Sequence, residues 1–305
     1  MLEKVDLTKK ISKEEYKAKM PQMEIELGRL QRECRELKIP VMIVFEGFGA
    51  SGKGVQIGKL IQSMDPRGFQ VFPIKAETED ERMHPFLWRF WTKTPEAGRI
   101  AIFDGSWYRK VLIDRFEKRT REKEIETAFH SIEAFEKQLT DGGTILVKLL
   151  LDIDQKEQKK RFEKLLEKKE TAWRVSQGDR ERNAKYSEYA AMMEEVLYRS
   201  DTKSAPWTVI EATDRRFATV KIYMTVIHAL AEAVEAVQRR RMEEQAIKAA
   251  EQVSGQQEAA EIMRQAGGEL EMLQSSVLSR ADLTLAYGKE EYEKRLKKLQ
   301  KNCLL

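Results

Sequence analysis

Short apolar runs alternate along this chain with longer segments in which apolar residues recur at helical spacing. Five runs are predicted to be strands, at residues 41–45, 69–75, 99–103, 144–153 and 207–212. The first run, VMIVF, is apolar throughout, which is typical of a strand covered on both faces. Strands that alternate with helices form a parallel sheet. The pattern therefore predicts an α/β fold with a five-stranded parallel sheet.

The segments between the runs are predicted to be helices. Residues 13–37 are highly charged but carry apolar residues at helical spacing, so a helix is added before the first strand. Residues 55–64, 84–94 and 107–139 follow the first three strands, and another helix starts near Asp214. Ligands of such sheets bind at the carboxyl ends of the strands.

Composition narrows the class of protein. Of the 305 residues, 35% are charged and 41% hydrophobic, and the net charge is +4, which suits a helix-rich soluble protein. The two cysteines, Cys34 and Cys303, lie far apart without metal-ligand spacing, so a reducing, cytoplasmic location is expected. The longest continuous apolar run, around Val41–Phe45, is too short to span a membrane. We expect neither a membrane nor a nucleic acid as a partner.

A glycine-rich stretch between the first strand and the next helix fits the spacing G-x-x-x-x-G-K. Its residues are Gly47, Phe48, Gly49, Ala50, Ser51, Gly52 and Lys53, followed by Gly54. Such a P-loop turns its backbone N–H groups toward an anion, the following helix adds its dipole, and the lysine reaches terminal phosphates. We predict a phosphate site, with an unliganded glycine turn as the alternative. An ordinary P-loop has Ser or Thr at position 54 for magnesium, so other groups must hold any metal here.

Two further residues are candidates for the same site. Asp104 ends the third strand and is expected beside the P-loop, where a carboxylate can bind magnesium. Its alternative role, compatible with the first, is to cap the helix that starts near Trp107. Arg89, on the predicted helix 84–94, is a candidate phosphate contact.

The segment between strands four and five is strongly basic. Residues 156–185 contain eleven Lys or Arg and six Asp or Glu, so the segment carries about +5. We predict a helical lid that closes over polyanionic phosphates, with a solvated helix laced by i,i+4 ion pairs as the alternative. Its candidate phosphate contacts are Arg161, Arg174, Arg180 and Arg182.

The end of the chain repeats its beginning. Leu278–Arg295 matches Leu2–Lys19 at one fixed offset, with Asp-Leu-Thr and Lys-Glu-Glu-Tyr in both copies. Three parts are predicted from this repeat: a P-loop domain at 1–238, a helical or flexible linker at 239–277, and the truncated start of a second copy at 278–305.

Several motifs together resemble the polyphosphate kinase 2 family. They are FEGFGASGKG (45–54), MDPRGF (64–69), FDGSWY (103–108), the stretch from Trp173-Arg174 to Asp179, and SAPW (204–207). The resemblance implies a P-loop NTPase-like three-layer sandwich with a thymidylate-kinase-like fold, a helical lid and the added N-terminal helix. It also implies phosphate transfer between inorganic polyphosphate and nucleotides with Mg²⁺. Some members carry two such domains and phosphorylate AMP, which the repeat at Leu278 would fit.

The resemblance also implies roles for matched positions. Lys53 and the backbone around it would hold phosphate, and Asp104 would bind Mg²⁺. Arg67, in the Asp-Pro-Arg-Gly turn, and lid residues such as Arg174 would contact polyphosphate or an adenine nucleotide, AMP or ADP. Lys53, Asp104 and Asp114 are thus the catalytic candidates, and a homo-oligomer is expected.

Four departures from catalytic members weaken the expected activity. Gly49 replaces a P-loop Asp, and Gly105 replaces an Arg that would neutralise the transferring phosphate. Arg109 and Lys110 stand where Asn-Arg is expected, and Asp114 replaces a Glu. Losing a metal ligand or an Arg clamp costs orders of magnitude in rate, so we expect a weakly active or degenerate unit, like the N-terminal unit of tandem members.

Three alternatives stay open. One is an active nucleotide kinase in which Arg109 or Lys110 replaces the missing arginine. Another is a nucleoside monophosphate kinase of thymidylate-kinase type. The third is a non-catalytic phosphate-binding or scaffold domain that supports a catalytic partner.

Overall fold

The five apolar runs form one sheet, as predicted. Its strands are β1 (Val41–Gly47), β2 (Phe69–Pro73), β3 (Ile100–Asp104), β4 (Ile145–Asp152) and β5 (Trp207–Glu211). The order is β2-β3-β1-β4-β5, and all four pairings are parallel. All seven residues of the central strand β1 are buried. The expected five-stranded parallel sheet is confirmed.

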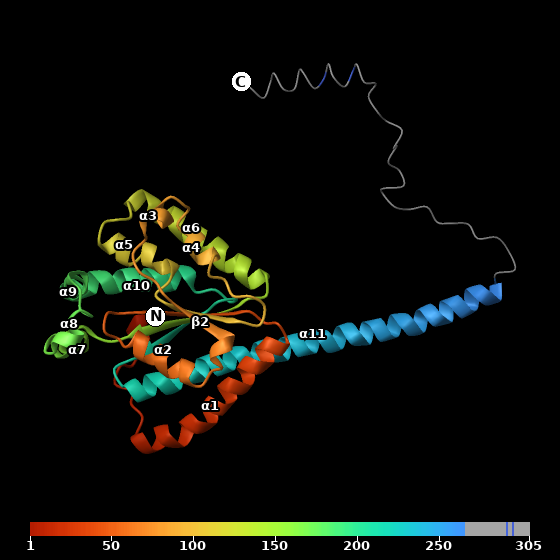
Figure 1. Cartoon of the computed structure of the whole chain (residues 1–305), viewed down its shortest axis with the longest axis horizontal. Coiled ribbons are helices and arrows are strands. Elements are labelled where there is room, and N and C mark those ends of the chain that lie inside the picture. Colours follow the sequence, from red (N-terminus) through yellow and green to blue (C-terminus); the bar gives the residue numbers. More distant parts are fainter. Residues whose placement is uncertain (266–290, 292–294, 296–305) are drawn as a thin grey trace. The chain divides into compact units, whose positions relative to one another are not determined.

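A computed structural model describes residues 1–265, Glu291 and Arg295 (Figure 1). One compact unit comprises Met1–Glu243 and the other Glu244–Leu305. Residues 266–277 of the predicted linker lie outside the described residues, as does the predicted second copy at 278–305 apart from Glu291 and Arg295. The three domain limits therefore stay predictions.

Helices cover both faces of the sheet. They are α1 (Lys13–Glu36), α2 (Lys53–Gln62), α3 (Glu79–Arg82), α4 (Trp88–Trp91), α5 (Ile113–Phe116), α6 (Glu122–Asp141), α7 (Gln155–Leu166), α8 (Lys169–Ala172), α9 (Gln177–Ala184), α10 (Tyr186–Ser200) and α11 (Arg215–Gln265), with 3₁₀ turns η1 (Leu2–Lys4), η2 (Pro66–Gly68) and η3 (Trp107–Lys110). Figure 1 shows α1, α2 and α11 on one side of the sheet and α5, α6 and α10 on the other. The predicted three-layer architecture is therefore present.

The added N-terminal helix begins at a capping box. The Ser12 side chain accepts a hydrogen bond from the Glu15 N–H, and the Glu15 carboxylate accepts one from the Ser12 N–H. This pairing satisfies two N–H groups that the helix itself cannot. On the inner face Leu27, Leu30 and Cys34 are buried, so α1 packs as part of the core.

Two predicted helices are interrupted. The segment 84–94 keeps a short helix, α4, preceded by a turn around Pro85, because proline lacks the N–H of a continuous helix. The segment 107–139 divides into η3, α5 and α6. The break after α5 is fixed by the Asp114 carbonyl, which accepts hydrogen bonds from the N–H groups of Arg119 (2.7 Å) and Thr120 (3.1 Å). The interruption brings polar side chains of this loop to the site described below.

Among the described residues, one helical segment is long and apolar enough to cross a membrane. It lies in α11, within Arg215–Ile247. Half of that apolar window is buried inside the fold. Tyr223, Val226 and Leu230 are at most 1% exposed. A helix in the core of a globular protein can be as long and as apolar as a membrane-spanning one. Packing against the sheet accounts for the apolar face of α11.

Candidate functional site

The P-loop joins β1 to α2 at the carboxyl end of the central strand. Gly47 ends β1 with a φ of 139°, and a Cβ at this position would lie 2.2 Å from the carbonyl oxygen of Leu151 on β4. Gly52, just before α2, has a φ of 108°. Both values lie in the left-handed region that favours glycine. The two glycines of the motif therefore fit the tight turn itself.

Every carbonyl group from Gly47 to Gly52 accepts a hydrogen bond. The donors are Lys53 Nζ to Gly47 (2.9 Å), the Ser51 N–H to Phe48 (3.1 Å), Gln158 Nε2 to Gly49 (3.0 Å), Arg161 Nη1 to Ala50 (3.1 Å) and Ser51 (3.0 Å), and the Gln56 N–H to Gly52 (3.0 Å). Within the described part of the chain, no acceptor is bound by the N–H groups of Gly49, Ala50, Gly52, Lys53 and Gly54.

The N–H of a trans peptide points away from its own carbonyl. With the carbonyl groups bonded, the loop therefore offers free N–H donors, and these are what an anion needs. The loop has this arrangement without a ligand. It supports the predicted phosphate site over an unliganded turn.

Lys53 and Glu46 lie at the base of this loop. Lys53 Nζ also approaches the Phe48 carbonyl (3.5 Å). Glu46, on β1, is buried and accepts a hydrogen bond from Ser106 Oγ (2.8 Å). Burial raises the pKa of Glu46, and the nearby charge of Lys53 opposes this rise. Sequence analysis missed Glu46, although a carboxylate that ends an apolar strand beside a P-loop is a usable signal.

Asp104 lies beside the P-loop, as its place in the sequence predicts. It pairs in register with Phe45 of β1, and its Oδ2 is 4.0 Å from where a Cβ of Gly54 would lie. In the described residues its carboxylate makes no hydrogen bond or ion pair. Its alternative role as a helix cap is wrong, because Ser106 caps η3 by accepting from the Tyr108 N–H.

The donor set near the loop fits a magnesium ion bound mostly by phosphates and water. The described residues contain no group of three or more His, Cys, Asp or Glu that could hold a metal. Magnesium commonly takes one or two carboxylates and completes its shell with substrate oxygens and water. Asp104 supplies one free carboxylate of this kind.

The segment between β4 and β5 folds into helices α7 to α10, and α7, α8 and α9 lie together at one edge of the Met1–Glu243 unit (Figure 1). These helices contact the P-loop. A Cβ at Gly49 would lie 3.0 Å from Asp179 Oδ1, 3.1 Å from Phe162 Cζ and 3.4 Å from Gln158 Nε2. The predicted lid segment is therefore helical and packed against the phosphate-binding loop.

The four lid arginines have different surroundings. Arg161 is buried, and all its donors are engaged within the protein, so its predicted contact with phosphate does not fit this structure. Arg182 is largely buried and pairs with Glu117 and Asp179. Arg174 and Arg180 are exposed. Their roles, and that of Arg182, stay predictions.

Arg67 and Arg89, the other two arginines predicted to contact phosphate or nucleotide, lie in different places. Arg67 precedes β2, so it lies at the amino end of the parallel sheet, whereas the P-loop lies at the carboxyl end. Its guanidinium pairs with Asp65. The structure therefore does not bring Arg67 to the P-loop. Arg89 is buried on α4 and lies 3.2 Å from Glu81.

A cavity of about 360 Å³ opens beside η3 and α5. It is lined by Ala76, Glu77, Arg82, Lys110, Asp114, Arg119 and Thr120. A small adjoining cavity shares Lys110 and Asp114 and adds Arg89 and Arg109. Asp114 lies 3.3 Å from Arg109 and 2.9 Å from Arg119. The structure thus brings Arg89, Arg109, Lys110 and Asp114 together, and adds Arg82 and Arg119, which sequence analysis missed.

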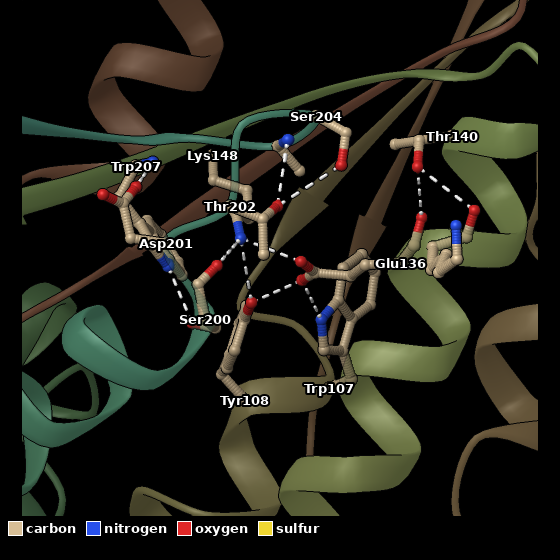
Figure 2. A network of polar contacts seen from close by, with 12 residues as sticks. Trp107, Tyr108, Glu136, Thr140, Lys148, Ser200, Asp201, Thr202, Ser204 and Trp207 are labelled. Atoms are coloured by element: carbon tan, nitrogen blue, oxygen red, sulfur yellow. Dashed lines mark hydrogen bonds and ion pairs between the residues drawn. The ribbon is translucent and has the colours of Figure 1, made fainter.

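A buried polar network supports the turn that carries Arg109 and Lys110. Figure 2 shows the side chains of Trp107 and Tyr108 directed at Glu136 of α6, with Lys148 of β4 beside them. Glu136 accepts from Lys148 Nζ (2.8 Å), Trp107 Nε1 (2.9 Å) and the Tyr108 hydroxyl. The two residues that precede Arg109 are thereby fixed to the core.

Comparison with known proteins decides the family. The family model described as Polyphosphate kinase 2 matches residues 10–241. The chain belongs to the polyphosphate kinase 2 family. A polyphosphate:AMP phosphotransferase of Pseudomonas syringae pv. tomato is 36% identical over 233 residues, covering 76% of this chain and 47% of that relative. An NDP-polyphosphate phosphotransferase of Ruegeria pomeroyi is 31% identical over 216 residues, covering 71% of this chain and 72% of that protein.

The structure of a polyphosphate kinase 2 from Arthrobacter aurescens matches with a TM-score of 0.71 and 30% identity, covering 76% of this chain and 85% of that one. The polyphosphate kinase 2 chain described here therefore has the P-loop kinase-like fold that its motifs predict. It spans about half the length of the Pseudomonas syringae relative.

Proposed function

We propose that this polyphosphate kinase 2 unit binds inorganic polyphosphate and transfers phosphate between it and an adenine nucleotide, AMP or ADP. The observation that carries the proposal is the P-loop at residues 47–54. Its carbonyl groups from Gly47 to Gly52 are bonded, whereas the N–H groups of Gly49, Ala50, Gly52, Lys53 and Gly54 have no acceptor among the described residues. Family relatives named as polyphosphate phosphotransferases for AMP and for nucleoside diphosphates support the choice of substrates.

We assign the two substrates to two sites, the P-loop and the cavity beside η3 and α5. The loop N–H groups, the N-terminus of α2 and Lys53 would bind phosphate oxygens. The cavity lined by Arg82, Lys110 and Arg119 also contains Glu77 and Asp114, and Arg119 pairs with Asp114. Its basic side chains would take an anionic acceptor such as a nucleotide phosphate. Mg²⁺ held by Asp104 would neutralise negative charge on the phosphate oxygens when it is bound.

The unit is proposed to be weakly active. The space beside Gly49 is occupied by Asp179 and Phe162, so the loop has no room for a catalytic carboxylate while the lid is in this position. Gly105 has a φ of 75°, where an arginine would sit in the left-handed region at a cost of about 1 kcal/mol. The local structure therefore favours glycine over the expected Asp at position 49 and over the expected Arg at position 105.

Turnover and binding are measured separately to test the proposal. The wild-type chain, Lys53→Ala and the matched control Lys59→Ala are incubated with long-chain polyphosphate, Mg²⁺ and AMP or ADP. Lys59 lies on the same helix, but its Nζ donates to the Tyr16 hydroxyl (3.0 Å) and faces α1. Binding is followed as the shift in melting temperature with inorganic tripolyphosphate.

The proposal expects slow turnover and clear binding in wild type and in Lys59→Ala. Loss of a charged hydrogen-bond donor in Lys53→Ala should weaken binding about tenfold or more. Binding without turnover in wild type would favour the non-catalytic, scaffold alternative. Absence of both would refute the phosphate site.

We also propose a cytoplasmic location and a homo-oligomer. A cytoplasmic location is supported by Cys34, which is a buried free thiol. A homo-oligomer, and the absence of membrane and nucleic-acid partners, are proposed from the sequence and are testable by light scattering and pull-down.

A further inference from the structure

Arg161 of α7 joins the lid segment to two carbonyls of the P-loop. Its side chain is 9% exposed. Nε donates to Glu157 Oε1 (2.7 Å), Nη1 to the carbonyls of Ala50 (3.1 Å) and Ser51 (3.0 Å), and Nη2 to the carbonyls of Ala212 (2.9 Å) and Thr213 (3.0 Å). A guanidinium has five N–H donors, and this geometry engages all five. Arg161 has none left for a ligand.

The two loop carbonyls held by Arg161 belong to the peptide units 50–51 and 51–52. The N–H of the second unit is that of Gly52, one of the free donors of the loop. Because C=O and N–H of a trans peptide point in opposite directions, holding the Ser51 carbonyl also sets the direction of the Gly52 N–H. A rotated peptide would present a carbonyl oxygen, which repels phosphate.

The second terminal nitrogen of the forked guanidinium, Nη2, fixes Arg161 itself. The carbonyls of Ala212 and Thr213 follow β5, and the Ala212 N–H donates to the Asp152 carbonyl on β4 (2.9 Å). The guanidinium is therefore anchored to the end of the sheet as well as to the glycine-rich loop. A planar fork suits this bridge, whereas an ammonium group cannot reach four carbonyls in the same way.

We propose that Arg161 is a positioning residue for anion binding: it fixes the peptide units 50–51 and 51–52, so that the free N–H of Gly52 faces phosphate. The inference rests on the proposed phosphate site. It differs from a direct contact, because the guanidinium acts through the loop backbone. The proposed role differs also from simple charge attraction, because the geometry of the guanidinium N–H donors matters more than its positive charge.

Two variants and a control separate these possibilities. Arg161→Lys keeps the charge but loses the fork, and Arg161→Met loses both. Arg199→Met removes a partly buried arginine of α10 whose partners, Glu126, Glu195 and the Phe129 ring, lie away from the loop. Each protein is titrated with inorganic tripolyphosphate at constant ionic strength, and its melting temperature is measured without ligand.

Both Arg161 variants are expected to bind tripolyphosphate about tenfold more weakly or worse, the loss expected when the hydrogen bond from the Gly52 N–H to a charged phosphate oxygen is no longer made. Arg199→Met should lose melting temperature but keep wild-type affinity. Wild-type affinity in Arg161→Lys would overturn the inference in favour of charge alone. Wild-type affinity in folded Arg161→Met would overturn it entirely.

Failures of the two proposals are distinguishable. If wild type does not bind tripolyphosphate, the proposed function fails, and this inference with it. If wild type binds and Arg161→Met does not fold, the folded Arg161→Lys protein decides the matter, because retained affinity overturns the inference and lost affinity supports it.

Discussion

Replacing Lys148 with methionine should leave the Glu136 carboxylate buried without its ion-pair partner. The Lys148 side chain is fully buried and donates to Glu136 (2.8 Å), to the Tyr108 hydroxyl (3.2 Å) and to the Ser200 carbonyl (2.6 Å). Burial lowers the pKa of Lys148, and the charge of Glu136 opposes this shift. Methionine fills a similar volume, so the perturbation is mainly electrostatic.

The size of the effect follows from what remains around Glu136. Removing one partner of a buried pair costs about 3–5 kcal/mol. Trp107 and Tyr108 still donate to the carboxylate, so we expect a loss near the lower end, about 3 kcal/mol. For a domain of this size, that corresponds to a fall of roughly 6–12 °C in melting temperature. Adding Glu136→Gln removes the second charge and should restore part of the loss.

Urea unfolding of wild type, the two single variants and the double variant, followed by tryptophan fluorescence, measures the coupling. We expect each single variant to lose more stability than the double variant, with an unchanged slope against urea. If Lys148→Met unfolds within about 1 kcal/mol of wild type, or if the double loss equals the sum of the single losses, the ion-pair reasoning is refuted.

Three other perturbations have defined outcomes. Gly47→Ala should destabilise by several kcal/mol in urea melts, because its Cβ would lie 2.2 Å from a backbone oxygen, whereas Gly52→Ala, with a φ of 108° and open space, should cost about 1–2 kcal/mol. Gly49→Asp should displace the lid and increase proteolysis of residues 156–185, and unchanged protection would contradict that contact. Burial raises the pKa of Asp152 to about 6, so the stability that this shift contributes is present below about pH 4 and lost as pH rises through 6. The free energy of unfolding should fall by at most about 3 kcal/mol between pH 4 and 7 in wild type, and Asp152→Asn should remove this fall. A pH profile of stability that is the same in Asp152→Asn as in wild type would contradict this assignment.

The sheet and the P-loop were predictable from sequence because their causes are local. A strand buried on both faces must be apolar throughout, as β1 is, and the turns at Gly47 and Gly52 require glycine. The position of Asp104 beside the loop followed from the parallel order of the strands. These features depend on a few consecutive residues, and the structure has them where the pattern predicts.

The interior polar network was not predicted, although signals for it exist. Lys148 interrupts an otherwise apolar strand, and a lysine there must find a partner. Glu136 lies on the apolar stripe of α6 with Phe129, Ile132 and Leu139. Each signal shows that a partner is needed, but the identity of the partner depends on two elements that meet only in the folded chain.

The sequence by itself determined the α/β class, the five strands, the phosphate-binding loop and the family resemblance, because local periodicity and motif spacing carry that information. Tertiary structure decided what each basic residue does. Arg67, Arg89, Arg161 and Arg174 are chemically alike in the sequence, yet one lies at the far end of the sheet, one is buried beside Glu81, one holds carbonyls and one faces solvent. Charge can be read from composition, but the partner of a charge is fixed only by the packing of distant elements.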